Sequence, residues 1–113
     1  MHIRILVLMA LLGSASLVQA AGPDPHLRVL AASCAACHGY NGNSVGGTPV
    51  LAGLDRSHFI VQMQAFRSGA RASTVMARHA KGLNEAEIEQ LADYFSAQSR
   101  RTASAPLPLK GAW

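Results

Sequence analysis

Apolar residues recur at the spacing of one helix face in three stretches of this chain, and no clear β-rich run is present. The first stretch covers residues 26–38, the second runs from about residue 55 to 68, and the third follows residue 84. The pattern predicts three amphipathic helices, each with one buried face. These faces carry Leu27, Leu30 and Ala31 in the first helix, Phe59, Ile60, Met63 and Phe66 in the second, and Ile88, Leu91, Ala92 and Phe95 in the third.

Capping residues mark where these helices begin. Pro25 is well placed at the start of the first helix, because its fixed φ suits a first helical position. Asp55 or Ser57 can cap the second helix. Asn84 precedes the third, and Glu87 follows three residues later, as in a capping box. The starts of all three helices are therefore predicted from local signals.

Two longer segments connect the helices. Residues 39–53 contain five glycines together with asparagine and proline, which predicts a loop. Residues 70–83 are predicted to be mainly loop, with a short helical turn near Ala77. The sequence thus predicts an all-α domain with three main helices and long loops.

The N-terminus has the pattern of a secretory signal peptide. A short basic start at Arg4 precedes an apolar run over residues 5–12, and small residues precede a cleavage point after Ala20. The apolar run is shorter than the about 20 residues that a membrane-spanning helix needs. We expect residues 1–20 to be removed and the remaining chain to be periplasmic, without stable membrane insertion. An uncleaved anchor is the alternative.

The chemistry of the chain concentrates at Cys34, Cys37 and His38. The motif C-x-x-C-H is the attachment site of c-type haem. Two thiols three residues apart on a helix lie on one face, where they can reach the two vinyl groups along one porphyrin edge. The histidine that follows can then ligate the iron. The sequence predicts one covalent haem c, with thioethers at both cysteines and His38 as an axial ligand.

Two other interpretations of the cysteine pair remain open from the residues alone. A thioredoxin-like redox dithiol needs strands alternating with helices around it, and none are predicted. Half of a zinc site needs a second pair of ligands at suitable spacing, whereas His58 and His79 are far apart and isolated. Haem attachment is the interpretation that the pattern favours.

The part that remains after cleavage is one small domain, expected over residues 21–101, with a proline-rich tail over residues 102–113. A chain of this size buries little core by itself and often relies on a cofactor. A covalent haem would supply that missing core. The formal net charge is only +4, so nucleic-acid binding has no support.

Beyond the motif, the chain resembles the class I c-type cytochromes. The runs CAACHGYNGNS, TPVLAGL, QMQAFRSGARASTVMARHAKGL and EIEQLADYFSAQ are similar to the cytochrome subunits of flavocytochrome c sulfide dehydrogenases and their small soluble relatives. The resemblance covers residues 27–98. It implies a small cytochrome c fold, in which the first and last helices cross with Tyr94 and Phe95 at the crossing, around one covalently bound haem.

Met76 is the expected sixth ligand of the iron. It is predicted in the loop before the last helix, free to reach the haem, and it matches the axial methionine of the family. His79 is its main competitor, and Met63 is interpreted as a core residue. The resemblance also implies that the Pro49 carbonyl accepts the ring N–H of His38 and that Leu51 lines the haem pocket. Arg78 and Lys81 are candidates to pair with a haem propionate.

The expected function is transfer of single electrons rather than catalysis, because both axial positions would be filled by protein groups. The resemblance implies a haem subunit that accepts electrons from an FAD-containing sulfide dehydrogenase subunit. Flavocytochrome subunits often carry two haem domains, whereas one C-x-x-C-H motif predicts one electron per molecule here. A free-standing carrier cytochrome is the first alternative, and a haem enzyme or gas sensor with an open sixth site is the second.

Overall fold

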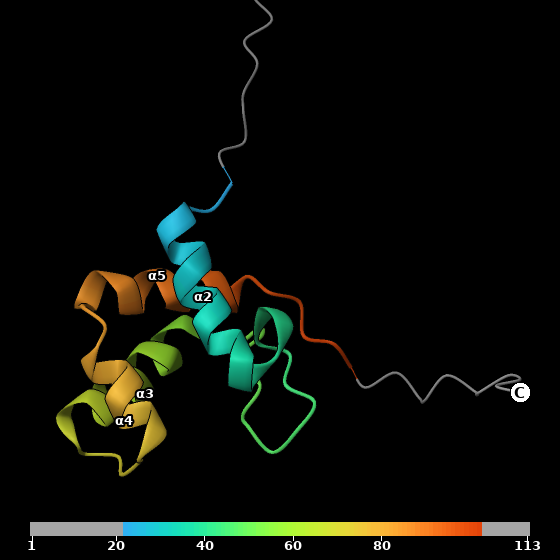
Figure 1. Ribbon diagram of the computed structural model, residues 1–113. Helices are drawn as coiled ribbons and strands as arrows, with labels where there is room; N and C mark the ends of the chain where they lie inside the picture. The colour runs from blue at the N-terminus through green and yellow to red at the C-terminus, as the bar shows by residue number, and fades with distance from the viewer. Residues whose placement is uncertain (1–21, 103–113) are drawn as a thin grey trace, which may run out of the picture.

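The computed structural model describes residues 22–102, which form a small all-helical domain (Figure 1). Helix α2 crosses α5, while α3 packs against both α4 and α5. In the described range, no helix has both the length and the apolar character needed to cross a membrane. The elements are α2 (Pro25–His38), the 3₁₀ turn η1 (Tyr40–Gly42), α3 (Arg56–Ser68), α4 (Val75–Lys81) and α5 (Glu85–Ser96).

The predicted class of fold and the three main helices are confirmed. The expected signal peptide at residues 1–20 lies outside the described residues, as do residues 103–113 of the expected tail. Pro25 is the first residue of α2, and the side chain of Asp55 rather than Ser57 caps α3 by accepting the His58 N–H at 2.8 Å. Asn84 and Glu87 form the predicted capping box at the start of α5.

Helix α4 is the main difference from the predicted elements. The sequence pattern predicts mainly loop over residues 70–83 with a short helical turn near Ala77, whereas the structure has a longer helix at that place, Val75–Lys81. A seven-residue helix is too short to be stable alone, so tertiary packing decides it. Ala80 is fully buried, and the Ser73 hydroxyl accepts the Met76 N–H at 3.0 Å at the helix start. Packing against α3 therefore stabilises a helix that its length alone would not predict.

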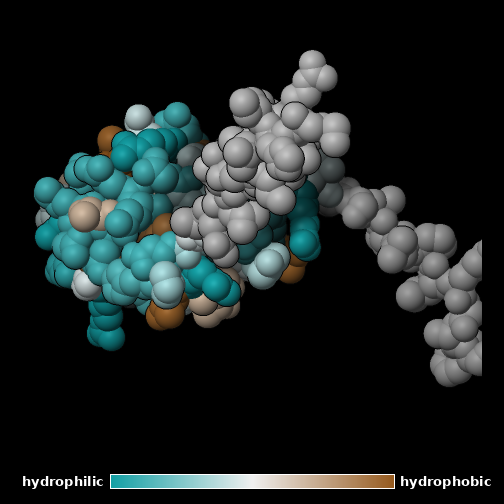
Figure 2. Space-filling model, turned by 90° about the horizontal axis from the view of Figure 1, so that it is seen from above, coloured by the Kyte–Doolittle hydropathy of each residue, from teal (hydrophilic) through white to brown (hydrophobic). Residues whose placement is uncertain are grey.

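The core lies where α3 and α5 meet. Phe59 and Phe95 pack with their ring centroids 5.8 Å apart, and Tyr94 meets Phe95 edge-on at 5.1 Å. The Tyr94 hydroxyl also donates to Asn41 Oδ1 at 2.8 Å, which ties α5 to η1 after α2. On the face shown in Figure 2, the described surface is mainly hydrophilic with isolated apolar residues. The apolar faces of the helices are thus turned mostly inward.

Gly42 is where the loop after α2 comes closest to α5. Its φ is +75°, a backbone angle that residues with a side chain rarely adopt. A Cβ at this position would lie 2.8 Å from Leu51 Cβ and 2.9 Å from Phe95 Cδ1. Its carbonyl accepts the backbone N–H of Leu51 at 2.8 Å and of Ala52 at 3.1 Å. Gly42 therefore holds the loop that carries Leu51 against the core.

Replacing Gly42 with alanine should destabilise the domain by roughly 2–4 kcal/mol, because overpacking and positive φ both oppose the new methyl group. Chemical denaturation followed by circular dichroism measures the effect. Gly46→Ala is the matched control, since nothing lies within 4 Å of a Cβ at that position. Equal stability of the two variants would contradict the close approach at Gly42.

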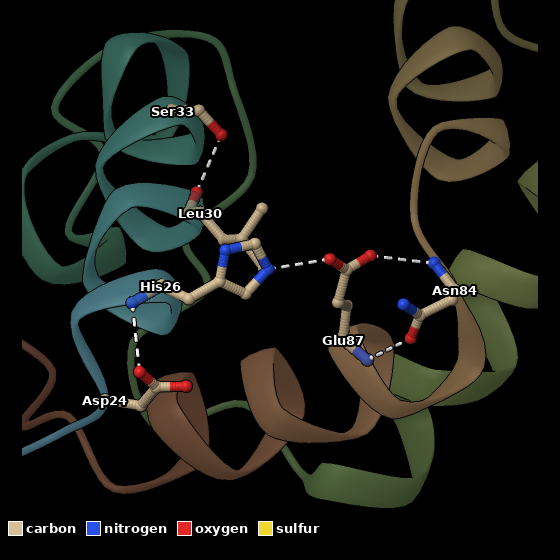
Figure 3. Close-up of polar contacts among 6 residues, drawn as sticks. All are labelled: Asp24, His26, Leu30, Ser33, Asn84 and Glu87. Carbon is tan, nitrogen blue, oxygen red and sulfur yellow. Dashed lines mark hydrogen bonds and ion pairs between the residues drawn. The ribbon is translucent and has the colours of Figure 1, made fainter.

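A contact between the side chains of His26 and Glu87 joins the starts of α2 and α5 (Figure 3). His26 Nε2 lies 2.8 Å from Glu87 Oε1, and the other carboxylate oxygen accepts the Asn84 backbone N–H at 2.9 Å. The Asn84 N–H, and to a lesser extent His26, holds the pKa of Glu87 below its ordinary value. One carboxylate therefore serves both the capping box and the contact between α2 and α5.

Glu87→Gln should lower the unfolding temperature at neutral pH and have little effect in acid. A carboxylate with a lowered folded-state pKa stabilises the fold above its unfolded-state pKa, and this contribution is lost as the pH falls through the folded-state value. Thermal melts of the wild type and the variant between about pH 7 and pH 3 test this. Glu85→Gln removes the same charge from the same helix start and should show no comparable pH-dependent difference.

Candidate haem site

Helix α2 ends in the cysteine motif. Cys34 is half-buried, Cys37 is exposed, and both thiols are free. His38 is the last residue of the helix, and Gly39 ends it with a φ of +76°. A Cβ at Gly39 would lie 2.5 Å from the Asn43 carbonyl oxygen, so only glycine allows this tight exit. The chain thus turns sharply after His38 and returns as the loop that faces it.

The imidazole of His38 is held by that loop. The ring is buried, with 8% of its surface exposed, and Nδ1 lies 2.7 Å from the carbonyl oxygen of Pro49. A carbonyl can only accept a hydrogen bond, so Nδ1 carries the proton and Nε2 is left with a free lone pair. This is the arrangement that metal-bound histidines generally have. The predicted contact between Pro49 and His38 is present in the structure.

A second contact anchors the same loop to α2. The Thr48 hydroxyl donates to the Cys37 carbonyl oxygen and also contacts the Ser44 hydroxyl at 2.8 Å. The Cys37 carbonyl belongs to the last turn of the helix, where it has no partner within the helix. Thr48 therefore satisfies this carbonyl and keeps Pro49 opposite His38.

These groups open onto one cavity of about 270 Å³ between the helices. Cys34, Cys37 and His38 contribute to it from α2, and Leu51 contributes from the returning loop. Other apolar walls come from α3 and α5. Leu51, which is predicted to line the haem pocket, is thus one of the residues around this cavity.

Two methionines and, besides His38, two further histidines line this cavity. Met63 lines it from α3 but is 5% exposed and belongs to the packed core. Met76 is half-buried and lines the cavity from the first turn of α4, in a helix and not in the expected loop. His79 also lines it, one turn further along α4. Residues three apart share a helix face, so Met76 and His79 are presented to the same space.

Three residues that the sequence pattern does not predict at the cavity also line it: His58, Gln62 and Arg71. His58 and Gln62 are four residues apart on α3, so they lie on the same side of this helix. Helical spacing could therefore have predicted that the two side chains face the same space. Arg71 follows the end of α3, where no periodic pattern continues. Arg78 and Lys81, the expected propionate partners, do not line the cavity.

The structure also bears on the redox-dithiol interpretation. Burial raises the pKa of the Cys34 thiol, partly opposed by the hydrogen bond with Ser33. A catalytic dithiol needs the opposite shift, because the thiolate is the nucleophile. Together with the all-helical fold of residues 22–102, this disfavours a thioredoxin-like function.

The zinc interpretation gains no support from the described residues. Within residues 22–102, no group of three or more His, Cys, Asp or Glu side chains could hold a metal ion. A structural zinc site uses four such ligands. The cysteine pair therefore faces an apolar cavity instead of a second pair of metal ligands.

These residues fit a covalently attached haem. The cavity has largely apolar walls, two free thiols on one helix and a buried histidine whose Nε2 can bind a metal. An imidazole and a methionine thioether, which His38 and Met76 supply at this cavity, are a known pair of axial ligands in electron-transfer haems. The fold and the site together define a small helical protein built around one haem.

Comparison with known proteins identifies the family. Residues 28–99 match the family model described as cytochrome c, and the chain belongs to this family. The C-x-x-C-H motif in this match implies one covalent haem c at Cys34, Cys37 and His38. This domain is a monohaem electron carrier and is not itself catalytic.

Relatives of this chain include proteins of sulfur oxidation. The cytochrome subunit of sulfide dehydrogenase from Chlorobaculum tepidum is 41% identical over 73 residues, covering 65% of this chain and 66% of that protein. The thiosulfate dehydrogenase electron acceptor from Thiomonas intermedia is 42% identical over 80 residues, covering 69% of this chain and 37% of that protein. Cytochrome c-554(547) from Halothiobacillus neapolitanus is 36% identical over 76 residues, covering 58% of this chain and 84% of that protein. The first match confirms the resemblance drawn from the sequence.

Proposed function

We propose that this chain is exported to the periplasm by a signal at residues 1–20 and carries single electrons from a dehydrogenase that oxidises reduced sulfur compounds. In this proposal an FAD-containing subunit oxidises sulfide, and the haem of this chain accepts the electrons one at a time. The observation that carries the haem function is the convergence of both thiols, His38 and Met76 on one cavity. The names of the first two relatives support the sulfur-oxidising setting.

We further propose that His38 and Met76 are the two axial ligands. Haem c supplies a one-electron couple of ferric and ferrous iron at this site. The Pro49 carbonyl accepts a hydrogen bond from Nδ1, which orients the His38 ring and, in the neutral ring, leaves Nε2 as the nitrogen that can bind iron. A thioether from Met76 in place of a second nitrogen favours the ferrous state and raises the reduction potential.

The remaining residues of the site control what reaches the haem. Leu51, Phe59 and other apolar residues line the cavity and exclude water from it. Cys37 is exposed, so the attachment side of the cavity meets the surrounding solvent. Electrons therefore enter and leave at this side, while two protein ligands keep substrates away from the iron.

A free-standing carrier is the second candidate. The cytochrome from Halothiobacillus neapolitanus supports it, because the matched region covers 84% of that small protein. A carrier of this kind would use the same haem and the same ligands. The two candidates differ in whether the chain is held in a complex with a flavoprotein.

Purification of the native protein separates these functions. We would isolate it from the periplasm of its host, record its visible spectrum, and test the reduction of its ferric form by sulfide. A low-spin c-type spectrum with stoichiometric FAD and rapid reduction supports the flavoprotein complex. A low-spin spectrum without flavin, and with no reduction by sulfide, supports the free carrier. A high-spin or colourless protein contradicts an electron carrier with two protein ligands.

A further inference from the structure

Among the described residues that line the haem cavity, Arg71 is the one Arg or Lys, and there is no Asp or Glu. It lies in the segment between α3 and α4, two residues after Gly69. In the described part of the chain, Arg71 has no ion pair with a carboxylate. A positive charge therefore borders an apolar cavity without an anionic partner from the described residues.

The guanidinium of Arg71 is held in position by two groups of α3. It donates a hydrogen bond to Gln62 Oε1, and its Cζ lies 4.5 Å from the ring centroid of Phe66. The backbone is fixed as well, because the Arg71 N–H donates to the Ala65 carbonyl at 3.0 Å. An arginine oriented in this way is preorganised to bind an anion, since little side-chain freedom remains to be lost.

Haem c has one anionic feature, the pair of propionate carboxylates. They lie on the porphyrin edge opposite the two thioether bonds. In Figure 1 the segment between α3 and α4, drawn yellow, lies at the lower left, away from the end of α2 that carries the two cysteines. The segment that carries Arg71 and the end of α2 that carries the cysteines thus border the same cavity from different elements.

We propose that Arg71, oriented by Gln62 and Phe66, binds a haem propionate and thereby raises the reduction potential. The proposal rests on the presence of the haem. Arginine and carboxylate form strong charge-assisted hydrogen bonds. A fixed positive charge near the iron disfavours the more positive ferric state, so the pair shifts the equilibrium toward ferrous. Arg71 is therefore a positioning residue that sets the potential through the propionate.

The experiment measures the midpoint potential of the holoprotein by spectroelectrochemistry at fixed pH. Arg71→Gln should shift the ratio of ferric to ferrous haem, at a given applied potential, roughly three- to tenfold toward ferric. Arg71→Lys keeps the charge and should restore most of the wild-type ratio. Gln62→Leu should shift it in the same direction by a smaller factor.

Arg78→Gln is the matched control, because it removes one arginine charge from α4 at a position that does not line the cavity. Its ratio should change less than twofold, because Arg78 does not line the cavity and solvent and salt screen its charge from the haem. A ratio for Arg71→Gln equal to that of Arg78→Gln overturns the proposal, and so does failure of lysine to restore the ratio. Salt in the buffer is kept constant for all variants.

A second measurement uses the wild type alone and covers the case in which Arg71→Gln fails to mature. In the NMR spectrum of the ferrous holoprotein, the Arg71 Nε–H should exchange slowly with water and be displaced by the haem ring current. Rapid exchange at the unperturbed shift overturns the proposal. A wild type without a low-spin haem contradicts the proposed function instead, so the two failures are distinguishable.

Discussion

The double variant Cys34→Ala, Cys37→Ala should lose covalent haem and most of its cooperative folding. The cavity of about 270 Å³ would be left behind, and at about 24 cal/mol per Å³ a hole of this size costs on the order of 6 kcal/mol. The whole stability of a small domain is only about 5–15 kcal/mol. The loss of the cofactor therefore removes a large share of the free energy of folding.

Haem staining on a denaturing gel and far-UV circular dichroism during a thermal melt measure both effects. Ser33→Ala is the matched control, because Ser33 also lines the cavity and the variant keeps both thiols. The control should retain haem and a cooperative melt. Wild-type helicity and melting in the double variant would show that the helices of this domain do not need the haem.

Met76→Ala should abolish the weak near-infrared band that arises from sulfur bound to ferric haem. The same variant should lower the reduction potential by roughly 0.1 V or more, within the about 0.8 V over which axial ligands set haem potentials. The reason is that thioether ligation favours the ferrous state, and the variant loses this ligation. His79, which lines the cavity from the next turn of α4, is placed to take over as a nitrogen ligand.

Met63→Leu separates ligation from packing. Met63 is buried in the core, so leucine should cost less than about 1.5 kcal/mol and leave the near-infrared band unchanged. A band that persists in Met76→Ala and disappears in Met63→Leu would assign the sixth ligand to Met63. A bis-nitrogen spectrum in Met76→Ala that disappears in Met76→Ala, His79→Ala would identify His79 as the replacement ligand.

Local signals account for much of the predicted structure. Asn84 and its partner Glu87 are three residues apart, and they form the capping box that the sequence predicts. The residues from Cys34 to His38 lie together at the end of one helix, so the haem attachment motif can also be identified from neighbouring residues in the sequence. Predictions of this kind succeed because every interacting group is close in the sequence.

Helix α4 shows where local signals end. Its residues include no periodic apolar face long enough to predict a full helix. Ala80 is fully buried, and α4 packs against α3. Because Met76 is on this helix, the structure changes its expected setting from a flexible loop to a helical turn at the cavity wall. Nucleation makes so short a helix unfavourable until tertiary contacts form.

The cavity lining separates what the sequence determined from what only the tertiary structure decided. The sequence alone determined the haem attachment at Cys34, Cys37 and His38, the three main helices and the family, because these depend on short spacings along the chain. The tertiary structure decided that Met63, Met76 and Arg71 reach one cavity, since residues from separate helices meet only when the chain packs. Periodicity tells which side of a helix is apolar, but long-range packing sets which groups face one another across the core.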